Sequence, residues 1–101
     1  MIFEWDEEKN KKNYKKHGVT FHVAESVFHD SNARLIYDDN HSSDEDRYIL
    51  LGMSDDLKLL VVVHIYFEDI YLDQDQLIRI ISARKASQSE EKQYMRFKDE
   101  R

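Results

Sequence analysis

Beyond Ala33, the apolar residues of this chain change from helical spacing to the runs typical of β-strands. β-Branched and aromatic residues are concentrated in four stretches that we expect to be strands: Arg34–Asp38, Tyr48–Met53, Leu59–Phe67 and Leu77–Ala83. The polar sequence Ser54-Asp55-Asp56 predicts a tight turn between the second and third of them. Such a meander folds into a mostly antiparallel sheet, and the other elements have to cover or extend it.

Two helices are expected before these strands. Asp6 can cap the first helix, glutamates and then lysines follow along it, and Gly18 stands just past its end, in agreement with the helix dipole. Its neutral residues share one face that can dock, namely Asn10, Asn13, Tyr14 and His17. The second helix runs from about Phe21 to Phe28 with Thr20 as its N-cap, and its apolar stripe is Phe21, Ala24, Val27 and Phe28.

The two ends of the chain complete the pattern. Ile2 to Glu4 is expected to be a short strand, and Ser87-Gln88-Ser89-Glu90 has the form of a capping box at the start of a last helix. The acidic segment Glu68 to Gln76 either extends the strands beside it or forms a loop. We therefore expect one α+β domain over residues 1–101, with two N-terminal helices packed on a mostly antiparallel four- to five-stranded sheet and a C-terminal helix.

Composition excludes several classes of function. The chain has no cysteine, which excludes a disulfide framework, a thiolate zinc site and a cysteine nucleophile. The longest apolar run, Leu57 to Phe67, is too short to span a membrane, and the N-terminus does not resemble a signal peptide, so we expect a cytoplasmic protein. A net charge of −6 argues against undirected binding to nucleic acid, although basic residues gather locally in the first helix and at the end of the last strand.

The basic end of the last strand is the first candidate site. In Arg79-Ile80-Ile81-Ser82-Ala83-Arg84-Lys85, strict alternation puts Arg79 on one face with Ile81, and Ser82 and Arg84 on the other with Ile78 and Ile80. An arginine in so apolar a strand needs an anionic partner. That partner is either an internal carboxylate, the commoner case, or a bound phosphate.

Histidines and lysines give further candidates. His64 interrupts a valine run, where it is either a core histidine or a group tuned for proton transfer. His22, Glu25 and His29 share a helix face that could hold a metal, although surface residues with this spacing are more common. The lysines of the first helix, with Tyr14 and His17, form either a solvated face or a positive patch that contacts phosphate or an acidic partner.

A series of motifs follows along the chain up to about Ala86. The first are Phe3-Glu4-Trp5-Asp6, then Lys9 and Asn13, then Lys16-His17-Gly18-Val19-Thr20-Phe21 with Ala24, Val27 and Phe28 behind them. The later ones are Arg47-Tyr48 leading to Gly52, Leu60-Val61-Val62-Val63-His64, and Ile78-Arg79-Ile80-Ile81-Ser82-Ala83-Arg84-Lys85-Ala86. In this order they resemble the BrnT family of bacterial toxins.

This resemblance implies a type II toxin that cleaves RNA, inhibits translation and growth, and has a compact fold similar to the RelE group of ribonucleases. The implied partner is an antitoxin of the BrnA type with a ribbon-helix-helix domain. The expected complex is two-to-two, and it contacts operator DNA only through the antitoxin. Such ribonucleases need no metal or other cofactor, because the ribose 2′-hydroxyl attacks the adjacent phosphate.

The resemblance also implies roles for single residues. Arg79 and Arg84 are the candidates for holding the phosphate and stabilising its charge, assisted by Arg47 and Lys85. His64, His17 and Tyr94 are, in this order, the candidates for proton transfer. Lys12 and Lys16, together with His17, are expected to contact RNA from the first helix.

Two segments depart from the family pattern. Ile65 to Gln76 is longer and more acidic than the short turn expected there, and Ser87 to Glu91 carries Gln, Ser and Glu where family members commonly have arginines. Fewer positive charges predict weaker binding to RNA. The alternative function is therefore a catalytically weak or inactive module that binds its antitoxin and acts in operon autoregulation. A metal hydrolase that uses His22 and His29 is a third, less favoured hypothesis.

Overall fold

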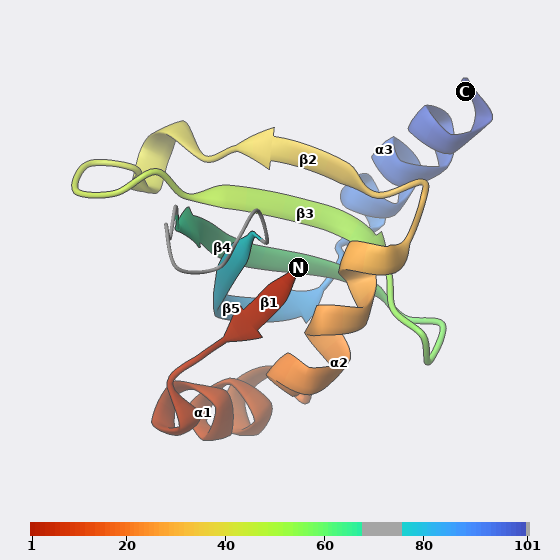
Figure 1. Ribbon diagram of the computed structural model, residues 1–101. Coiled ribbons are helices and arrows are strands. Elements are labelled where there is room, and N and C mark those ends of the chain that lie inside the picture. Colours follow the sequence, from red (N-terminus) through yellow and green to blue (C-terminus); the bar gives the residue numbers. More distant parts are fainter. Residues whose placement is uncertain (68–75, 101) are drawn as a thin grey trace.

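The computed structural model describes residues 1–67 and 76–100. Its elements follow the order β1 (Ile2–Glu4), α1 (Glu7–His17), α2 (Phe21–Ser26), η1 (Val27–His29), β2 (Arg34–Tyr37), η2 (Asp39–His41), β3 (Tyr48–Met53), β4 (Leu59–Phe67), β5 (Leu77–Lys85) and α3 (Gln88–Asp99). The strands form one sheet in the order β1-β5-β4-β3-β2 (Figure 1). β1 is parallel to β5 and the other pairs are antiparallel. The predicted α+β architecture is confirmed.

Element boundaries differ from the predictions by a few residues. The second helix ends at Ser26 and continues as the 3-10 turn η1, while β5 extends two residues further, to Lys85. Most of the acidic segment whose structure the sequence left open, residues 68–75, lies outside the described residues. Within the described ranges, no helix is long and apolar enough to cross a membrane.

Helix α1 begins and ends as its sequence predicts. The Asp6 carboxylate accepts a hydrogen bond from the Lys9 amide, and Gly18 takes the left-handed conformation, with φ 71°, that closes the helix. The docking face is only partly as expected. Asn13 is buried, but Tyr14 is 58% exposed and does not dock. Tyr14 therefore lies on the solvated side of the helix.

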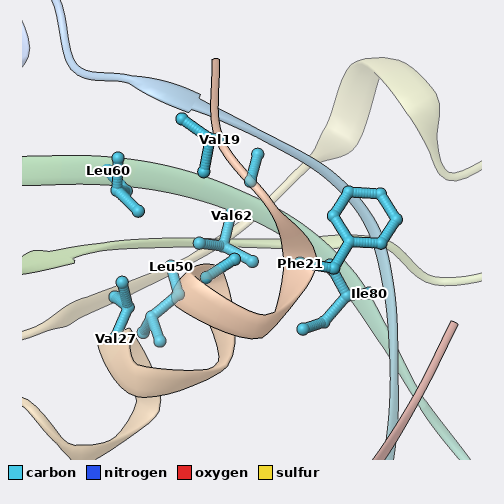
Figure 2. Packing of buried hydrophobic residues seen from close by; sticks show 9 residues of the cluster. Val19, Phe21, Val27, Leu50, Leu60, Val62 and Ile80 are labelled. Carbon is cyan, nitrogen blue, oxygen red and sulfur yellow. The ribbon is translucent and has the colours of Figure 1, made fainter. Parts of the chain in front are cut away.

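The main core lies between the sheet and α2 (Figure 2). It contains Val19, Phe21, Ala24, Val27, Leu50, Leu60, Val62, Ile80 and Ala83. Gly52 on β3 permits the close approach of the segment after α2, because a Cβ there would lie 2.8 Å from both the Ala33 Cβ and the Val27 Cγ1. Burial of these side chains accounts for the position of α2 on this face.

A smaller core lies on the opposite face of the sheet. There, Tyr94 of α3 packs against Leu51 and Val61, with Ile49, Met53, Leu59 and Ala86 around them. The Tyr94 hydroxyl donates a hydrogen bond of 2.7 Å to the Asp30 carboxylate. Tyr94 is the one residue of α3 that is fully buried, so it fixes the helix to the body of the protein.

Strand β5 contains an irregularity that the sequence did not predict. Val63 of β4 pairs with Ser82, but the next residue, His64, pairs with Ile80, so Ile81 is an extra residue in a β-bulge. The bulge shifts the alternation of side chains by one. Arg84, Ser82 and Arg79 consequently pair with Val61, Val63 and Ile65, which share one face of β4. The expectation that Arg79 and Arg84 lie on opposite faces is wrong, and neither Ser82 nor Arg84 shares a face with Ile80.

Asn13 of α1 takes the place of a neighbouring strand beside β5. Its side-chain amide donates to the Ala83 carbonyl at 2.8 Å and accepts from the Ala83 amide at 3.1 Å. The same amide group donates to the Val19 carbonyl at 2.8 Å. β1 pairs with β5 only from Leu77 to Arg79, so this contact satisfies backbone groups that β1 does not reach.

We predict that Asn13→Ala lowers the free energy of unfolding by about 2 kcal/mol, because buried amide and carbonyl groups of β5 lose their partner. Lys15→Ala, an exposed substitution on the same helix, is the control and should change stability by less than about 0.5 kcal/mol. Urea denaturation followed by circular dichroism measures both. Equal stability of the two variants would show that the Asn13 contacts do not hold α1.

Candidate functional site

The bulge brings three polar side chains together on one face of β5. Arg79, Ser82 and Arg84 all point to the side of the sheet on which α3 lies. The Arg79 Nε donates to the Glu4 carboxylate of β1 at 2.9 Å, and its guanidinium carbon lies 5.4 Å from the centre of the Phe67 ring. Its two terminal nitrogens bond no other described residue, so they are free to meet an anion.

Arg84 is held more firmly. Its two terminal nitrogens donate to the two carboxylate oxygens of Glu90 at 2.7 and 2.8 Å. Glu90 also accepts from the Ser87 amide, completing the predicted capping box of α3. The hydrogen bonds from Arg84 lower the pKa of Glu90 to about 2, and the same interaction raises the pKa of Arg84. Both arginines therefore have a carboxylate of their own chain as partner, as spacing alone favoured.

A basic groove runs between α1 and the exposed edge of β5. It has a volume of about 220 Å³ and is lined by Lys9, Lys12, Asn13, Lys16, His17, Ile81 and Ser82. Among the described residues, no carboxylate lines this groove. In the described part of the chain, the lysines of the groove form no ion pair, whereas Lys11 on the outer side of α1 lies 3.8 Å from Glu8. Ser82 borders both the groove and the arginine face, so the two basic surfaces adjoin at β5.

His64 lies inside the protein. Its ring is fully buried among aromatic side chains, with centroids 4.8 Å from Phe28 and 4.9 Å from Tyr66. Its Nδ1 is 3.1 Å from the Val62 carbonyl oxygen, and among the described residues its Nε2 has no hydrogen-bond partner. Burial lowers the pKa of His64 to about 4, so the ring is neutral at physiological pH. This environment is that of a core histidine.

Tyr94 is also enclosed. Burial, together with its hydrogen bond to Asp30, raises the pKa of Tyr94 to about 12. Although burial alone would raise the pKa of Asp30, that pKa is lowered because its carboxylate also accepts bonds from the amides of Met53 and Asn32. The phenol thus joins α3 to the loop before β2.

The remaining candidates are dispersed. Lys85 is exposed at the end of β5 and pairs with Leu60 on the α2 side of the sheet. Arg47 lies in the loop before β3, where its Nη2 is 3.6 Å from Glu45. Among the described residues, no group of three or more His, Asp or Glu side chains is placed to hold a metal ion, and the His22 ring lies 3.7 Å from Glu25.

Sequence reasoning missed some residues of these surfaces. Lys9 lines the groove, and the spacing of Lys9, Lys12 and Lys16 at i, i+3 and i+7 could have identified it as part of one helix face. Ser82 and Ile81 could not have been placed in the groove, because no local sequence pattern predicts the bulge. Glu90 could be predicted as a capping residue but not as the partner of Arg84.

The comparisons with known proteins agree with this architecture. The fold is similar to that in the crystal structure of the Brucella abortus ribonuclease toxin BrnT, with a TM-score of 0.62 and 24% sequence identity over 87% of this chain and 100% of that chain. The model of the family described as "Ribonuclease toxin, BrnT, of type II toxin-antitoxin system" matches residues 5–90. A search among curated protein sequences finds no match. The chain belongs to the BrnT family of ribonuclease toxins of type II toxin–antitoxin systems.

We predict that His64 makes the stability of this protein depend on pH. The pKa of His64 lies below its value of 6.5 in the unfolded chain, so the unfolded state binds more protons between pH 6.5 and 4, and stability falls as the pH falls through this range. From pH 7 to pH 5 this contribution is about 2 kcal/mol. Urea titrations of the protein and of His64→Phe should show a smaller loss in the variant. An equal loss in both would contradict this origin.

Proposed function

We propose that this toxin is a metal-independent endoribonuclease that cuts RNA in the cytoplasm and so inhibits translation and growth. The observation that carries the proposal is the arrangement of β5, where the arginine face and the basic groove meet at Ser82. Family membership supplies the class of reaction. In this mechanism the ribose 2′-hydroxyl attacks the adjacent phosphate, and the protein positions the backbone and stabilises negative charge.

Arg79 and Arg84 are proposed to hold the reacting phosphate. Within the described ranges the terminal nitrogens of Arg79 have no partner, and they can form a bidentate contact with phosphate oxygens while its Nε keeps Glu4. Arg84 carries a permanent charge near the same face, where it is paired with Glu90. Lys85, on the α2 side of β5, and Arg47, in the loop before β3, lie apart from this face, so we assign them no contact with the reacting phosphate. The developing charge on the phosphate is thereby stabilised without a metal ion.

For proton transfer we favour His17 over the two other candidates. The rings of His64 and Tyr94 are buried and occupied with structural contacts. His17 lines the basic groove at the end of α1 and remains partly exposed. Imidazole is the side chain best suited to exchange protons near neutral pH.

The proposed partner is a BrnA-type antitoxin with a ribbon-helix-helix domain, in a two-to-two complex that represses its own operon. Membership of a family of type II toxins supports a protein antitoxin as the partner. A net charge of −6 makes this chain a poor ligand for duplex DNA, so operator contacts would come from the antitoxin.

A second candidate function is a catalytically weak module that mainly binds its antitoxin. The ion pairs favour this second function, because Arg79 and Arg84 are each paired with a carboxylate of the same chain. A phosphate would have to compete with these carboxylates for the two guanidinium groups.

We predict that the double variant Arg79→Ala, Arg84→Ala cleaves single-stranded RNA at least about 100-fold more slowly than the parent protein in the presence of a chelator. The control is Glu4→Gln, Glu90→Gln, which breaks the same ion pairs but keeps both guanidinium groups and should retain activity. Gel analysis of the cleaved RNA measures the rates. An active arginine double variant would overturn the proposed site, and loss of activity on chelation would overturn metal independence.

We predict that the groove lysines contact the RNA backbone. In Lys12→Ala, Lys16→Ala, the slope of log Kd against log salt for a single-stranded RNA with 2′-O-methyl riboses should fall by about 1.4, because each phosphate contact contributes about 0.7. Lys11→Ala, Lys15→Ala removes the same charge from the outer side of the same helix and should leave the slope nearly unchanged. Equal slopes in the two double variants would exclude the groove as the binding surface.

A further inference from the structure

Strand β2 (Arg34–Tyr37) is an exposed edge of the sheet. In the part of the chain that the structure describes it pairs with β3 alone, and in Figure 1 it forms the upper margin of the sheet. Natural edge strands are protected from unwanted pairing by charged side chains, above all lysine, by proline or by a bulge. β2 has no lysine, proline or bulge, and its one charged residue, Arg34, stands at its start with the guanidinium over the Phe97 ring of α3. Leu35 is 50% exposed and Tyr37 is 43% exposed, so one face of the strand presents two large, partly exposed side chains. Such an edge is suited to pairing with another strand.

At Leu35 and Tyr37 the backbone amide and carbonyl groups of β2 point toward the open edge of the sheet. The Asp38 amide donates to the Arg47 carbonyl at 2.9 Å, which marks a hydrogen-bonded pair at this end of the β2–β3 ladder. Hydrogen-bonded and non-bonded pairs alternate along an antiparallel ladder, and Tyr37 pairs with Tyr48 in the next position. The amides and carbonyls of Leu35 and Tyr37 therefore point away from β3, toward an incoming strand.

The chain that follows β2 is strongly acidic. Residues 38–47 carry five carboxylates and one arginine. Three of the carboxylates have a partner: Asp38 lies 3.0 Å from the His41 ring, Asp46 accepts from the Tyr37 hydroxyl, and Glu45 lies 3.6 Å from Arg47. Asp39 and Asp44 are exposed and form no ion pair within the described ranges. This charge repels nucleic acid and favours a basic partner.

We propose that the β2 edge is a docking site for an extended segment of the antitoxin, which adds a sixth strand to the sheet beside β2. The segment presents apolar side chains to Leu35 and Tyr37 and basic side chains to residues 38–46. Main-chain hydrogen bonds supply affinity and the alternating side chains supply specificity, as in other cases of β-strand addition. The inference rests on the proposed pairing with a protein antitoxin.

This edge is separate from the surface proposed for RNA. β4 and β3 lie between β5 and β2 in the sheet, and the basic groove is on the far side of β5, next to α1. Changes at β2 therefore affect the antitoxin without touching the residues proposed to bind RNA. Failure of the docking proposal and failure of the proposed ribonuclease can be told apart for this reason.

Hydrogen exchange tests the added strand directly. We would compare the free chain with its complex with the cognate antitoxin, co-expressed and co-purified. The amides of Leu35 and Tyr37 should exchange at least about tenfold more slowly in the complex, while Ile36, whose amide faces β3, should change less. Unchanged exchange at both Leu35 and Tyr37 would overturn the proposal.

A lysine on the edge provides a second test. Leu35→Lys introduces the charge by which natural edge strands avoid pairing, and it should weaken antitoxin binding at least about tenfold in calorimetry. Leu57→Lys makes the same change at an apolar residue that is 83% exposed on the β3–β4 turn and should bind as the parent does. Both variants should keep the parent rate of RNA cleavage. Parent-like binding by Leu35→Lys would overturn the proposal.

Two further outcomes are decisive. The double variant Asp39→Asn, Asp44→Asn should bind the antitoxin more weakly, and its binding should depend less on salt. The double variant Asp55→Asn, Asp99→Asn is the control, because it removes the same charge elsewhere on the surface.

If the chain alone forms a dimer that Leu35→Lys dissociates, the edge belongs to a second copy and the antitoxin proposal is overturned. The exchange measurement uses the unmodified chain, so it decides the question whether or not the lysine variant folds.

Discussion

One extra residue in β5 sets the geometry of the candidate site. Without the bulge at Ile81, Arg79 and Arg84 would alternate onto opposite faces of the sheet, and one of them would enter the core beneath α2. With it, both guanidinium groups and Ser82 share the α3 side, while Ile80 and Ala83 remain in the main core. The strand thereby serves as a core strand on one face and a basic surface on the other.

The edge of the sheet at β5 changes partner close to the bulge. β1 stops pairing with β5 at Arg79, and from there α1 takes over, with Asn13 bound to the backbone of Ala83. This contact fixes a row of lysines beside an open stretch of strand and so forms the basic groove. Positive charge is concentrated at α1 and β5, and negative charge is concentrated in the loop between β2 and β3. An acidic protein can in this way offer phosphate one surface and a basic partner another.

The buried polar groups show why residue type alone is a weak guide to catalysis. His64 and Tyr94 have the chemistry of proton donors and acceptors, but one lies among aromatic rings and the other joins α3 to Asp30. Both pKa values are shifted by burial, in directions that favour the neutral forms. His17, on a helix otherwise rich in lysine, is the histidine that reaches the basic groove.

The sequence by itself determined the elements, their order and most of their ends. Caps at Asp6, Thr20 and Ser87, and apolar periods of helix and strand, depend on neighbours within a few residues, so they can be read locally. The family motifs indicated the class of protein for the same reason. Only the tertiary structure decided the bulge, the partners of Arg79 and Arg84, the burial of His64 and the open edge of β2. These depend on register and on contacts between residues far apart in the chain, and local spacing carries no information about either.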